Sequence, residues 1–211
     1  SEDETLIQAF RENEDIHTRT ASEVFQVAPD RVGADLRRQA KAINFGIIYG
    51  MSPFGLARQL EISQTMAKTY IDSYFVRYPG VKRFLDRTVA EARQTGRTST
   101  LLGRIRLLPD VAHSSPIVRQ AAERTAANTP IQGSAADLIK VAMIRIDDAL
   151  AREGFEAAML LTVHDELVFE VPPQEVDALR RRVREIMEGI WELRVPLQVN
   201  VATGSNWAEA H

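Results

Sequence analysis

One segment of the chain carries cations and aromatic rings at a regular spacing. Within residues 37–50 (RRQAKAINFGIIYG), every fourth position is occupied by Arg37, Lys41, Phe45 and Tyr49. On a helix of 3.6 residues per turn these side chains form one slowly drifting stripe, with about 6 Å between neighbours along the axis. Two cations one turn apart can bind adjacent phosphates of a triphosphate, and the next ring can face its sugar and base. The pattern fits a bound nucleotide, but a solvated cationic face followed by core aromatics has the same spacing.

A second segment places a histidine and two carboxylates side by side. His164, Asp165 and Glu166 lie between the apolar runs 157–163 and 167–171, which predict two strands joined by a tight turn. Adjacent carboxylates at the rim of a hairpin can hold a hard cation such as Mg²⁺, which prefers oxygen ligands. An ordinary polar turn explains the same residues, because turns are rich in Asp for local reasons.

The charge of the chain is unevenly distributed. The net charge of the 211 residues is −3, but residues 31–124 carry +9 and the flanking stretches 1–30 and 125–211 carry −6 each. A basic stretch suggests a polyanionic partner such as nucleic acid, although solvated helix faces explain it too. The absence of cysteine excludes disulfides, thiolate catalysis and Cys-based zinc sites, and fits a cytoplasmic protein. We expect no membrane span, because no apolar run approaches about 18 residues. We expect no secretory signal either, because the N-terminus is acidic and lacks an apolar h-region.

The elements that must position these residues are predicted to be helices followed by strands. The pattern of caps and apolar residues predicts helices at 4–12, 15–25 and 30–49, a helix that begins at Pro53, another from Ser63 to the break at 78–80, and a helix at 81–94. It also predicts a hairpin over 97–108 and a long helix over 116–152 that is kinked at 128–130. Strands are predicted at 157–163, 167–171 and 197–201, with a helix over 174–190. The expected fold class is therefore α+β, with a small antiparallel sheet.

Together with their flanking sequence, the two polar segments resemble a known family. Residues 37–50 are similar to motif B, and residues 163–166 (VHDE) to motif C, of the family A DNA polymerases of the bacterial DNA polymerase I type. The resemblance runs in the expected order over essentially the whole chain, and further similar stretches lie at 14–18, 78–81, 122–137 and 206–207. It implies a fingers-like helical subdomain over residues 1–113 and the C-terminal part of a palm over residues 114–211.

The resemblance implies a role for each residue of the nucleotide site. Arg37, Lys41 and His17 match positions that bind the phosphates of the incoming deoxynucleoside triphosphate. Lys41 also matches the position that protonates the leaving pyrophosphate, as a primary amine beside the phosphates can do. Phe45 matches the residue stacked against sugar and base.

The resemblance also implies a DNA interface and a metal site. The residues that match positions in contact with primer–template DNA are Tyr49, Arg124, Asn128, Gln132 and His164. Asp165 matches an aspartate that coordinates the two catalytic Mg²⁺ ions, and Glu166 matches its acidic neighbour, so both are expected catalytic metal ligands. The implied activity is template-directed transfer of deoxynucleotides to a primer 3′ end.

One motif of the family has no match in these residues. Motif A supplies the second metal-binding aspartate, and its strand would end just before Ser1. We therefore expect the N-terminal polymerase region, with motif A and the thumb, to be a partner, and the isolated chain to bind DNA without extending it. Two other functions remain possible: a non-catalytic DNA- or nucleotide-binding module, and a metal-dependent phosphohydrolase using Asp165, Glu166 and Glu170. The expected location is the bacterial cytoplasm, in association with the nucleoid.

Overall fold

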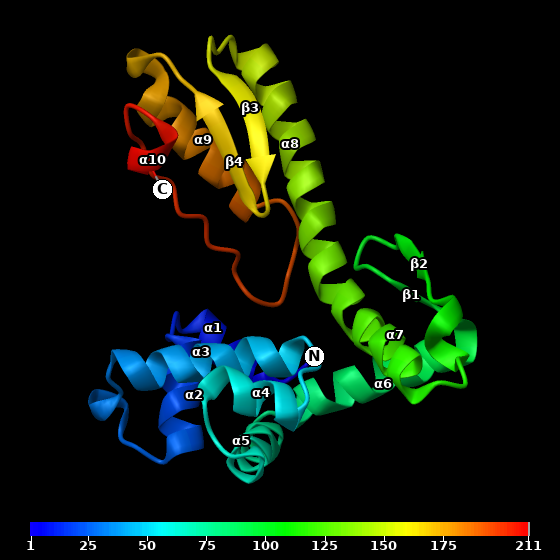
Figure 1. The fold of residues 1–211 in the computed structure, drawn as a ribbon. Coiled ribbons are helices and arrows are strands. Elements are labelled where there is room, and N and C mark those ends of the chain that lie inside the picture. Colours follow the sequence, from blue (N-terminus) through cyan, green and yellow to red (C-terminus); the bar gives the residue numbers. More distant parts are fainter. Residues whose placement is uncertain (211) are drawn as a thin grey trace. The chain divides into compact units, whose positions relative to one another are not determined.

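The computed structural model describes residues 1–210, which form two compact units. Unit 1 comprises residues Ser1–Gly133, and unit 2 begins at Ser134. Figure 1 shows the elements of both. The predicted boundary between residues 113 and 114 separates fingers from palm by function, and it stays a prediction.

Unit 1 is mostly helical, and three of its helices begin at predicted caps, whereas the helix predicted over 30–49 begins only at Ala34. Asp15 accepts hydrogen bonds from the backbone N–H groups of His17 and Thr18, while Ser52 and Ser63 each accept one from the first turn that follows. The helices of unit 1 are α1 (Glu4–Arg11), α2 (Ile16–Phe25), α3 (Ala34–Ile48), α4 (Pro53–Leu60), α5 (Gln64–Arg77), α6 (Pro79–Thr95) and α7 (Pro116–Asn128).

Helix α3 has two faces of different character. Its buried face carries Ile43 and Ile47, which join a core that also includes Leu56, Tyr74 and Tyr78. The opposite face carries the predicted stripe, which stays at the surface. Burial of the apolar face fixes the rotation of α3 about its axis and therefore the direction in which the stripe points.

The N-terminus of unit 1 is tied to a distant helix by a buried carboxylate. Asp3 is 4% exposed and accepts hydrogen bonds from the backbone N–H groups of Leu6, at 3.2 Å, and Gly80, at 2.8 Å. A Cβ atom at position 80 would lie 2.7 Å from the Asp3 Cβ, so only glycine allows this approach. Asp3 thereby joins the first turns of α1 and α6, which are 77 residues apart in the chain.

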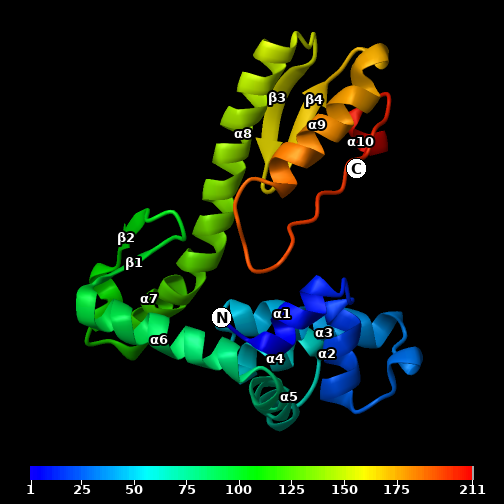
Figure 2. The same ribbon diagram turned by 180° about the vertical axis from the view of Figure 1, so that it is seen from behind.

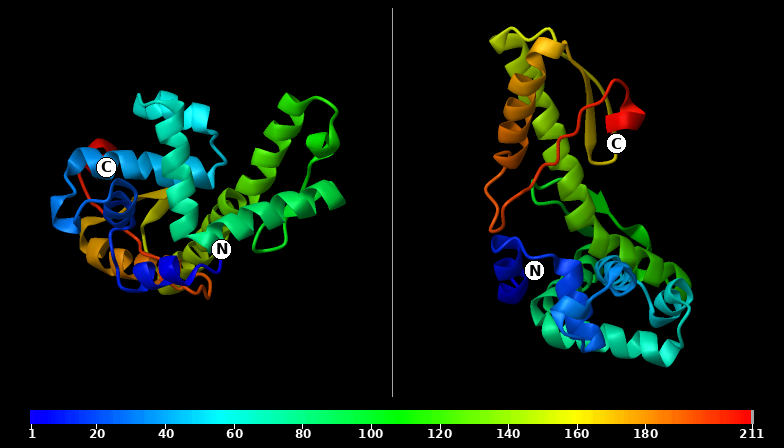
Figure 3. Two further views of the ribbon diagram at one scale, coloured as in Figure 1. Left: turned by 90° about the horizontal axis from the view of Figure 1, so that it is seen from below. Right: turned by 90° about the vertical axis from the view of Figure 1, so that its left-hand side faces the viewer.

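A predicted hairpin packs against α6 and the turn that follows α7. Strands β1 (Arg97–Ser99) and β2 (Ile105–Leu107) pair antiparallel, which confirms the hairpin predicted over 97–108. Helices α6 and α7 lie against one another next to it (Figure 3) and share a small core that includes Ala92 and Ala126. The π-helical turn Thr129–Gly133 follows α7, so the predicted interruption near Pro130 is confirmed.

Unit 2 is a hairpin covered by helices. Strands β3 (Ala158–Val163) and β4 (Glu166–Glu170) pair antiparallel and lie against α8 (Ser134–Glu153) and α9 (Val176–Glu188). Both helices lie on the same face of the hairpin (Figures 1 and 2), where Ile146, Leu150 and Val183 form the core. A short helix, α10 (Trp207–Ala210), ends the described part of the chain.

One predicted strand is wrong. Residues 197–201 form no strand, although Leu197 packs against the core of unit 2. The N–H of Val199 donates to the carboxylate of Glu188 at 3.0 Å instead of joining a ladder. The alternating apolar residues are partly buried because the extended segment lies against the core, and this does not require pairing with another strand. Helices with two separate antiparallel hairpins confirm the predicted α+β fold class.

Candidate functional site

The predicted stripe forms a continuous surface along α3. The Nζ atom of Lys41 lies 5.9 Å from the centroid of the Phe45 ring. That ring stacks on Tyr49 with 5.9 Å between centroids and 26° between planes. Phe45 is 42% exposed and Tyr49 is 36% exposed, which rules against the alternative that they are core aromatics. The cations and rings are therefore exposed together on one surface of unit 1.

Helix α2 adds a histidine to this surface. The ring of His17 lies 6.0 Å from that of Phe45, at an angle of 43°. One residue before α2, Asp15 accepts a hydrogen bond from Nε of Arg37 at 2.5 Å. The structure thus brings together the four predicted nucleotide-binding residues of unit 1, together with an acidic residue that already pairs with one of the cations.

The charges of this site shift two pKa values. Burial raises the pKa of Asp15, but hydrogen bonds from Arg37 and from the backbone of Thr18 and His17 outweigh it and lower the pKa from 3.8 to about 2. Burial lowers the pKa of His17, and the positive charges of Arg37 and Lys41 lower it further, against the opposing charge of Asp15. These effects favour the neutral form of His17 and the ionised form of Asp15.

Arg124 lies next to the end of α3. Gly50, which follows Tyr49, has φ +68°, and a Cβ atom there would lie 3.2 Å from Cγ of Arg124. Asn128 and Gln132 follow Arg124 at four-residue intervals; Gln132 is exposed, while Oδ1 of Asn128 is buried and has no hydrogen-bond partner among the described residues. The structure places Arg124 beside the stripe, and it places the two amides further along α7 and the turn after it.

The predicted metal-binding residues lie at the tip of the β3–β4 hairpin. His164 and Asp165 form the two-residue turn, with φ +55° at His164, and Glu166 begins β4. Both carboxylates are exposed. Glu170 lies at the other end of β4, opposite Ala158, about 13 Å along the strand at about 3.3 Å per residue. The structure therefore does not bring together the three carboxylates of the phosphohydrolase alternative.

The donor set at this turn fits Mg²⁺ in one respect. Mg²⁺ commonly takes one or two carboxylates and completes its shell with water and substrate phosphates. Asp165 and Glu166 offer carboxylates of that kind at an accessible position. Within residues 1–210, no group of three or more His, Cys, Asp or Glu side chains is arranged to hold a metal ion.

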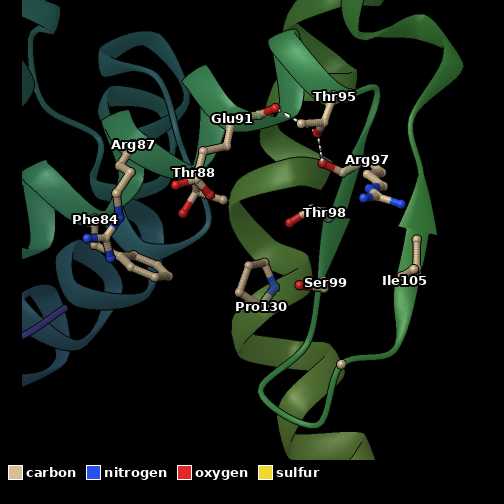
Figure 4. A pocket seen from close by; sticks show the side chains of 11 residues that line it. Phe84, Arg87, Thr88, Glu91, Thr95, Arg97, Thr98, Ser99, Ile105 and Pro130 are labelled. Atoms are coloured by element: carbon tan, nitrogen blue, oxygen red, sulfur yellow. Dashed lines mark hydrogen bonds between the residues drawn. The ribbon is translucent and has the colours of Figure 1, made fainter.

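A surface pocket of unit 1 lies away from these residues. It has a volume of about 540 Å³ and lies between α6, the β1–β2 hairpin and Pro130 (Figure 4). The side chains of Arg87 and Arg97 lie on different sides of the pocket, and Thr95 is engaged with the backbone oxygens of Glu91 and Arg97. The pocket contains none of the predicted nucleotide-binding, DNA-binding or metal-binding residues. The predicted sites therefore lie outside this pocket.

Sequence reasoning missed the polar residues behind the stripe. Asn44 is 5% exposed, and its Nδ2 lies 3.0 Å from Nδ1 of His17. Its Oδ1 accepts a hydrogen bond from Oγ1 of Thr20, which is fully buried. The available signal was a single amide within the apolar face of α3, between Ile43 and Ile47. The contact of Asp15 with Arg37 was missed as well, because only the cap of α2 is encoded locally.

Comparison with known proteins decides the family. The family model for DNA polymerase family A matches residues 1–209. The chain belongs to the family A DNA polymerases. The resemblance that motifs B and C indicated is thereby confirmed.

Relatives of this polymerase chain are much longer than the chain itself. It is 51% identical over 210 residues to DNA polymerase I of Bacillus caldotenax, and the aligned region covers 100% of this chain and 24% of that protein. It is 48% identical over 211 residues to DNA polymerase I of Pseudomonas aeruginosa, with 100% and 23% covered. The chain thus spans about a quarter of the length of these curated relatives.

A solved structure has a very similar fold. It is described as the POL domain of Pol1 from M. smegmatis in complex with DNA primer-template and dNTP. The match has a TM-score of 0.95 and 49% sequence identity, and it covers 99% of this chain and 37% of the other.

Among the described residues, none of the helices has the length and apolar character needed to cross a membrane.

Proposed function

We propose that this chain provides the nucleotide-binding surface and part of the catalytic centre of a template-directed DNA polymerase. The observation that carries the proposal is the assembly of His17, Arg37, Lys41 and Phe45 on one accessible surface of unit 1. The relatives are named DNA polymerase I, and the M. smegmatis structure contains primer-template and dNTP. In this assignment residues 1–113 act as fingers, and residues 114–211 form the C-terminal part of the palm.

The stripe would bind the incoming deoxynucleoside triphosphate. Arg37 and Lys41 lie one helical turn apart, a spacing that suits adjacent phosphates. Phe45 would stack against sugar and base, while the neutral His17 would donate a hydrogen bond without adding charge. During transfer the primer 3′-oxygen bonds to the α-phosphorus and its hydroxyl proton passes to solvent water. The bond between the α-phosphorus and the oxygen that bridges to the β-phosphate breaks, and Lys41 donates a proton to the departing pyrophosphate.

Other residues would contact the primer and the template. Amide and guanidinium donors can bind the minor-groove acceptors that every correct base pair presents, so they test pairing geometry without reading sequence. The residues assigned to this interface are Tyr49, Arg124, Asn128, Gln132 and His164.

Asp165 and Glu166 would hold Mg²⁺ at the tip of the β3–β4 hairpin. When two such ions are bound, they supply charge stabilisation for the attacking and leaving oxygens of the transfer. A second aspartate, of the motif A type, would come from the N-terminal polymerase region. We place the complete enzyme in the bacterial cytoplasm at the nucleoid.

The nucleotide assignment is tested by removing the amine of the stripe. A suitable enzyme is a chimaera in which the 211-residue chain replaces the matching 24% of the Bacillus caldotenax DNA polymerase I. In Lys41→Ala the loss of a charge-assisted hydrogen bond should slow single-turnover incorporation by about ten- to a hundredfold. The matched control is Lys82→Ala, because Lys82 also lies over a phenylalanine ring, Phe75, at 5.6 Å, but outside the stripe.

The incorporation rates of Lys41→Ala and Lys82→Ala decide the assignment. An incorporation rate of Lys41→Ala equal to that of Lys82→Ala would contradict the assignment of the stripe to the triphosphate. A loss confined to Lys41→Ala would support it, because both variants remove one exposed ammonium group.

The alternative of a non-catalytic DNA-binding module is distinguished by primer extension. We expect the 211-residue chain alone to bind primer–template weakly and in a salt-dependent way, in the non-specific range of about 10⁻⁴–10⁻⁶ M. We expect it not to extend the primer, and we expect the chimaera to do so. A chimaera that binds DNA but incorporates nothing would favour the non-catalytic module. Robust extension by the chain alone that Asp165→Ala abolishes would show that no second aspartate is needed.

A further inference from the structure

A buried chain of hydrogen bonds ends at the surface where the nucleotide is proposed to bind. It starts at Oγ1 of Thr20, which donates to Oδ1 of Asn44 at 3.0 Å. It continues from Nδ2 of Asn44 to Nδ1 of His17, also at 3.0 Å. Thr20 and Asn44 are 0% and 5% exposed, whereas His17 reaches the surface beside Phe45. The buried amide is thus connected to His17, whose imidazole can exist in two neutral tautomers.

The direction of these bonds fixes where the proton of the imidazole lies. With its oxygen occupied by the Thr20 hydroxyl, the amide of Asn44 turns its NH₂ group toward His17, and an NH₂ group can only donate. Nδ1 of His17 must therefore accept. In a neutral imidazole the remaining nitrogen then carries the proton, so Nε2 is the donor.

The surroundings keep the ring neutral. Burial and the neighbouring cations Arg37 and Lys41 lower the pKa of His17, and the opposing carboxylate of Asp15 does not reverse this effect. A neutral ring with its proton on Nε2 can donate to a phosphate oxygen. The other neutral tautomer would present a lone pair on Nε2, which repels a phosphate oxygen.

We infer that Asn44 is a positioning residue that holds His17 in the Nε2–H tautomer, so that His17 donates a hydrogen bond to the triphosphate of the incoming nucleotide. The inference rests on the proposed function for its ligand. Its structural half, the tautomer, is independent of any ligand. Asn44 touches neither nucleotide nor metal in this account and acts through His17 alone.

The tautomer can be measured directly on the 211-residue chain. Long-range ¹⁵N–¹H correlation spectra distinguish protonated from unprotonated ring nitrogens, and the signal of His17 is assigned by its disappearance in His17→Ala. The unsubstituted chain should show the proton of His17 on Nε2. His113 is an internal control, because its Nδ1 accepts from the backbone N–H of Ser115 at 3.0 Å and its tautomer does not depend on Asn44.

Two substitutions separate the hydrogen bond from the packing of α3. Asn44→Leu removes the donor at similar volume and should give His17 a mixture of tautomers, while His113 stays unchanged. Ile43→Val is the matched control, since it loosens the same buried face at a fully buried neighbour without removing a hydrogen bond. It should leave the tautomer of His17 unchanged.

The ligand half is tested by dNTP affinity, measured by titration of the same variants. Asn44→Leu should weaken binding by about twofold at equal populations of the two tautomers, because the apparent Kd rises in inverse proportion to the fraction of His17 in the Nε2–H form, and Ile43→Val should not. In the His17→Ala background Asn44→Leu should cause no further loss, because a residue that acts through another is not additive with it.

Several results would overturn the inference. A proton on Nδ1 of His17 in the unsubstituted chain, or a tautomer that Asn44→Leu leaves unchanged, would refute the structural half. An equal additional loss of affinity in the His17→Ala background would show that Asn44 acts by packing alone. If neither His17→Ala nor Lys41→Ala weakens dNTP binding, the proposed function itself is wrong, whatever the tautomer.

Discussion

The ion pair between Asp15 and Arg37 predicts that this chain binds a triphosphate less tightly than its cations allow. Arg37 is assigned to a phosphate, but its Nε donates to Asp15 at 2.5 Å. A phosphate that engages Arg37 must compete with this carboxylate. Removing the charge of Asp15 should therefore strengthen nucleotide binding. The substitution of choice is Asp15→Asn, because Asn caps a helix as well as Asp does and α2 keeps its first turn.

The size of the expected gain in dNTP affinity depends on how exposed the Asp15–Arg37 ion pair is. A pKa of about 2 for Asp15 instead of 3.8 corresponds to about 2.4 kcal/mol at most. The two side chains are 47% and 40% exposed, so solvent screening reduces the value of the pair to about 0.5–1 kcal/mol. Release of Arg37 should then raise the affinity for a dNTP by about two- to fivefold.

The assay is a titration of the 211-residue chain with dNTP at low and at high salt. Asp35→Asn is the matched control, since it frees Arg38 from an exposed pair of 2.8 Å on the same helix, outside the stripe. It removes the same charge and so reports the general electrostatic effect. Weaker binding in Asp15→Asn, or a gain no larger than that of Asp35→Asn, would refute the reasoning. In that case Asp15 would orient Arg37 for the phosphate instead of competing for it.

Three further substitutions or conditions test the scaffold of the site. Gly80→Ala should destabilise unit 1 by about 3 kcal/mol, because the added Cβ has no room and a buried hydrogen bond is lost. The measurement is urea unfolding followed by far-UV circular dichroism. The control Gly33→Ala, with open space around it, should change the stability by less than about 1 kcal/mol. Since the pKa of Asp15 is lower in the folded chain than in the unfolded one, the stability it contributes is complete above pH 3.8 and is lost as the pH falls through about 2; acid unfolding of Asp15→Asn should lack this component. Gly50→Ala, at φ +68° and against the stem of Arg124, should weaken primer–template binding in fluorescence anisotropy; unaltered affinity would contradict the placement of Arg124.

Local signals predicted the elements and the stripe. The caps at Asp15, Ser52 and Ser63 mark helix starts in the sequence because a cap bonds to N–H groups only two or three residues away. The spacing of Arg37 to Tyr49 predicted one face of a helix for the same reason, since the period of a helix is a local property.

Contacts between distant segments could not be predicted in this way. His17 and Asn44 are 27 residues apart, and their hydrogen bond depends on how α2 packs against α3. The contact of Asp3 with Gly80 depends likewise on the close approach of α1 and α6. The incorrect strand at 197–201 has the same origin, because a strand requires a partner that its own residues do not specify.

The two faces of α3 are connected by a hydrogen bond although one of them is buried. Its outer face carries the cations and the rings, and its inner face carries Ile43 and Ile47 in the core. Asn44 is the buried polar residue of the inner face, and its amide contacts His17 at the outer surface. A substitution in the core of α3 can therefore act in two different ways. Both Ile43→Val and Asn44→Leu should change the stability of unit 1, the latter because it leaves the buried hydroxyl of Thr20 without its acceptor. However, only Asn44→Leu should change the proton position of the His17 ring. Only the second should alter nucleotide binding in proportion to a tautomer shift, so the two effects can be separated by measuring unfolding and ring protonation on the same samples.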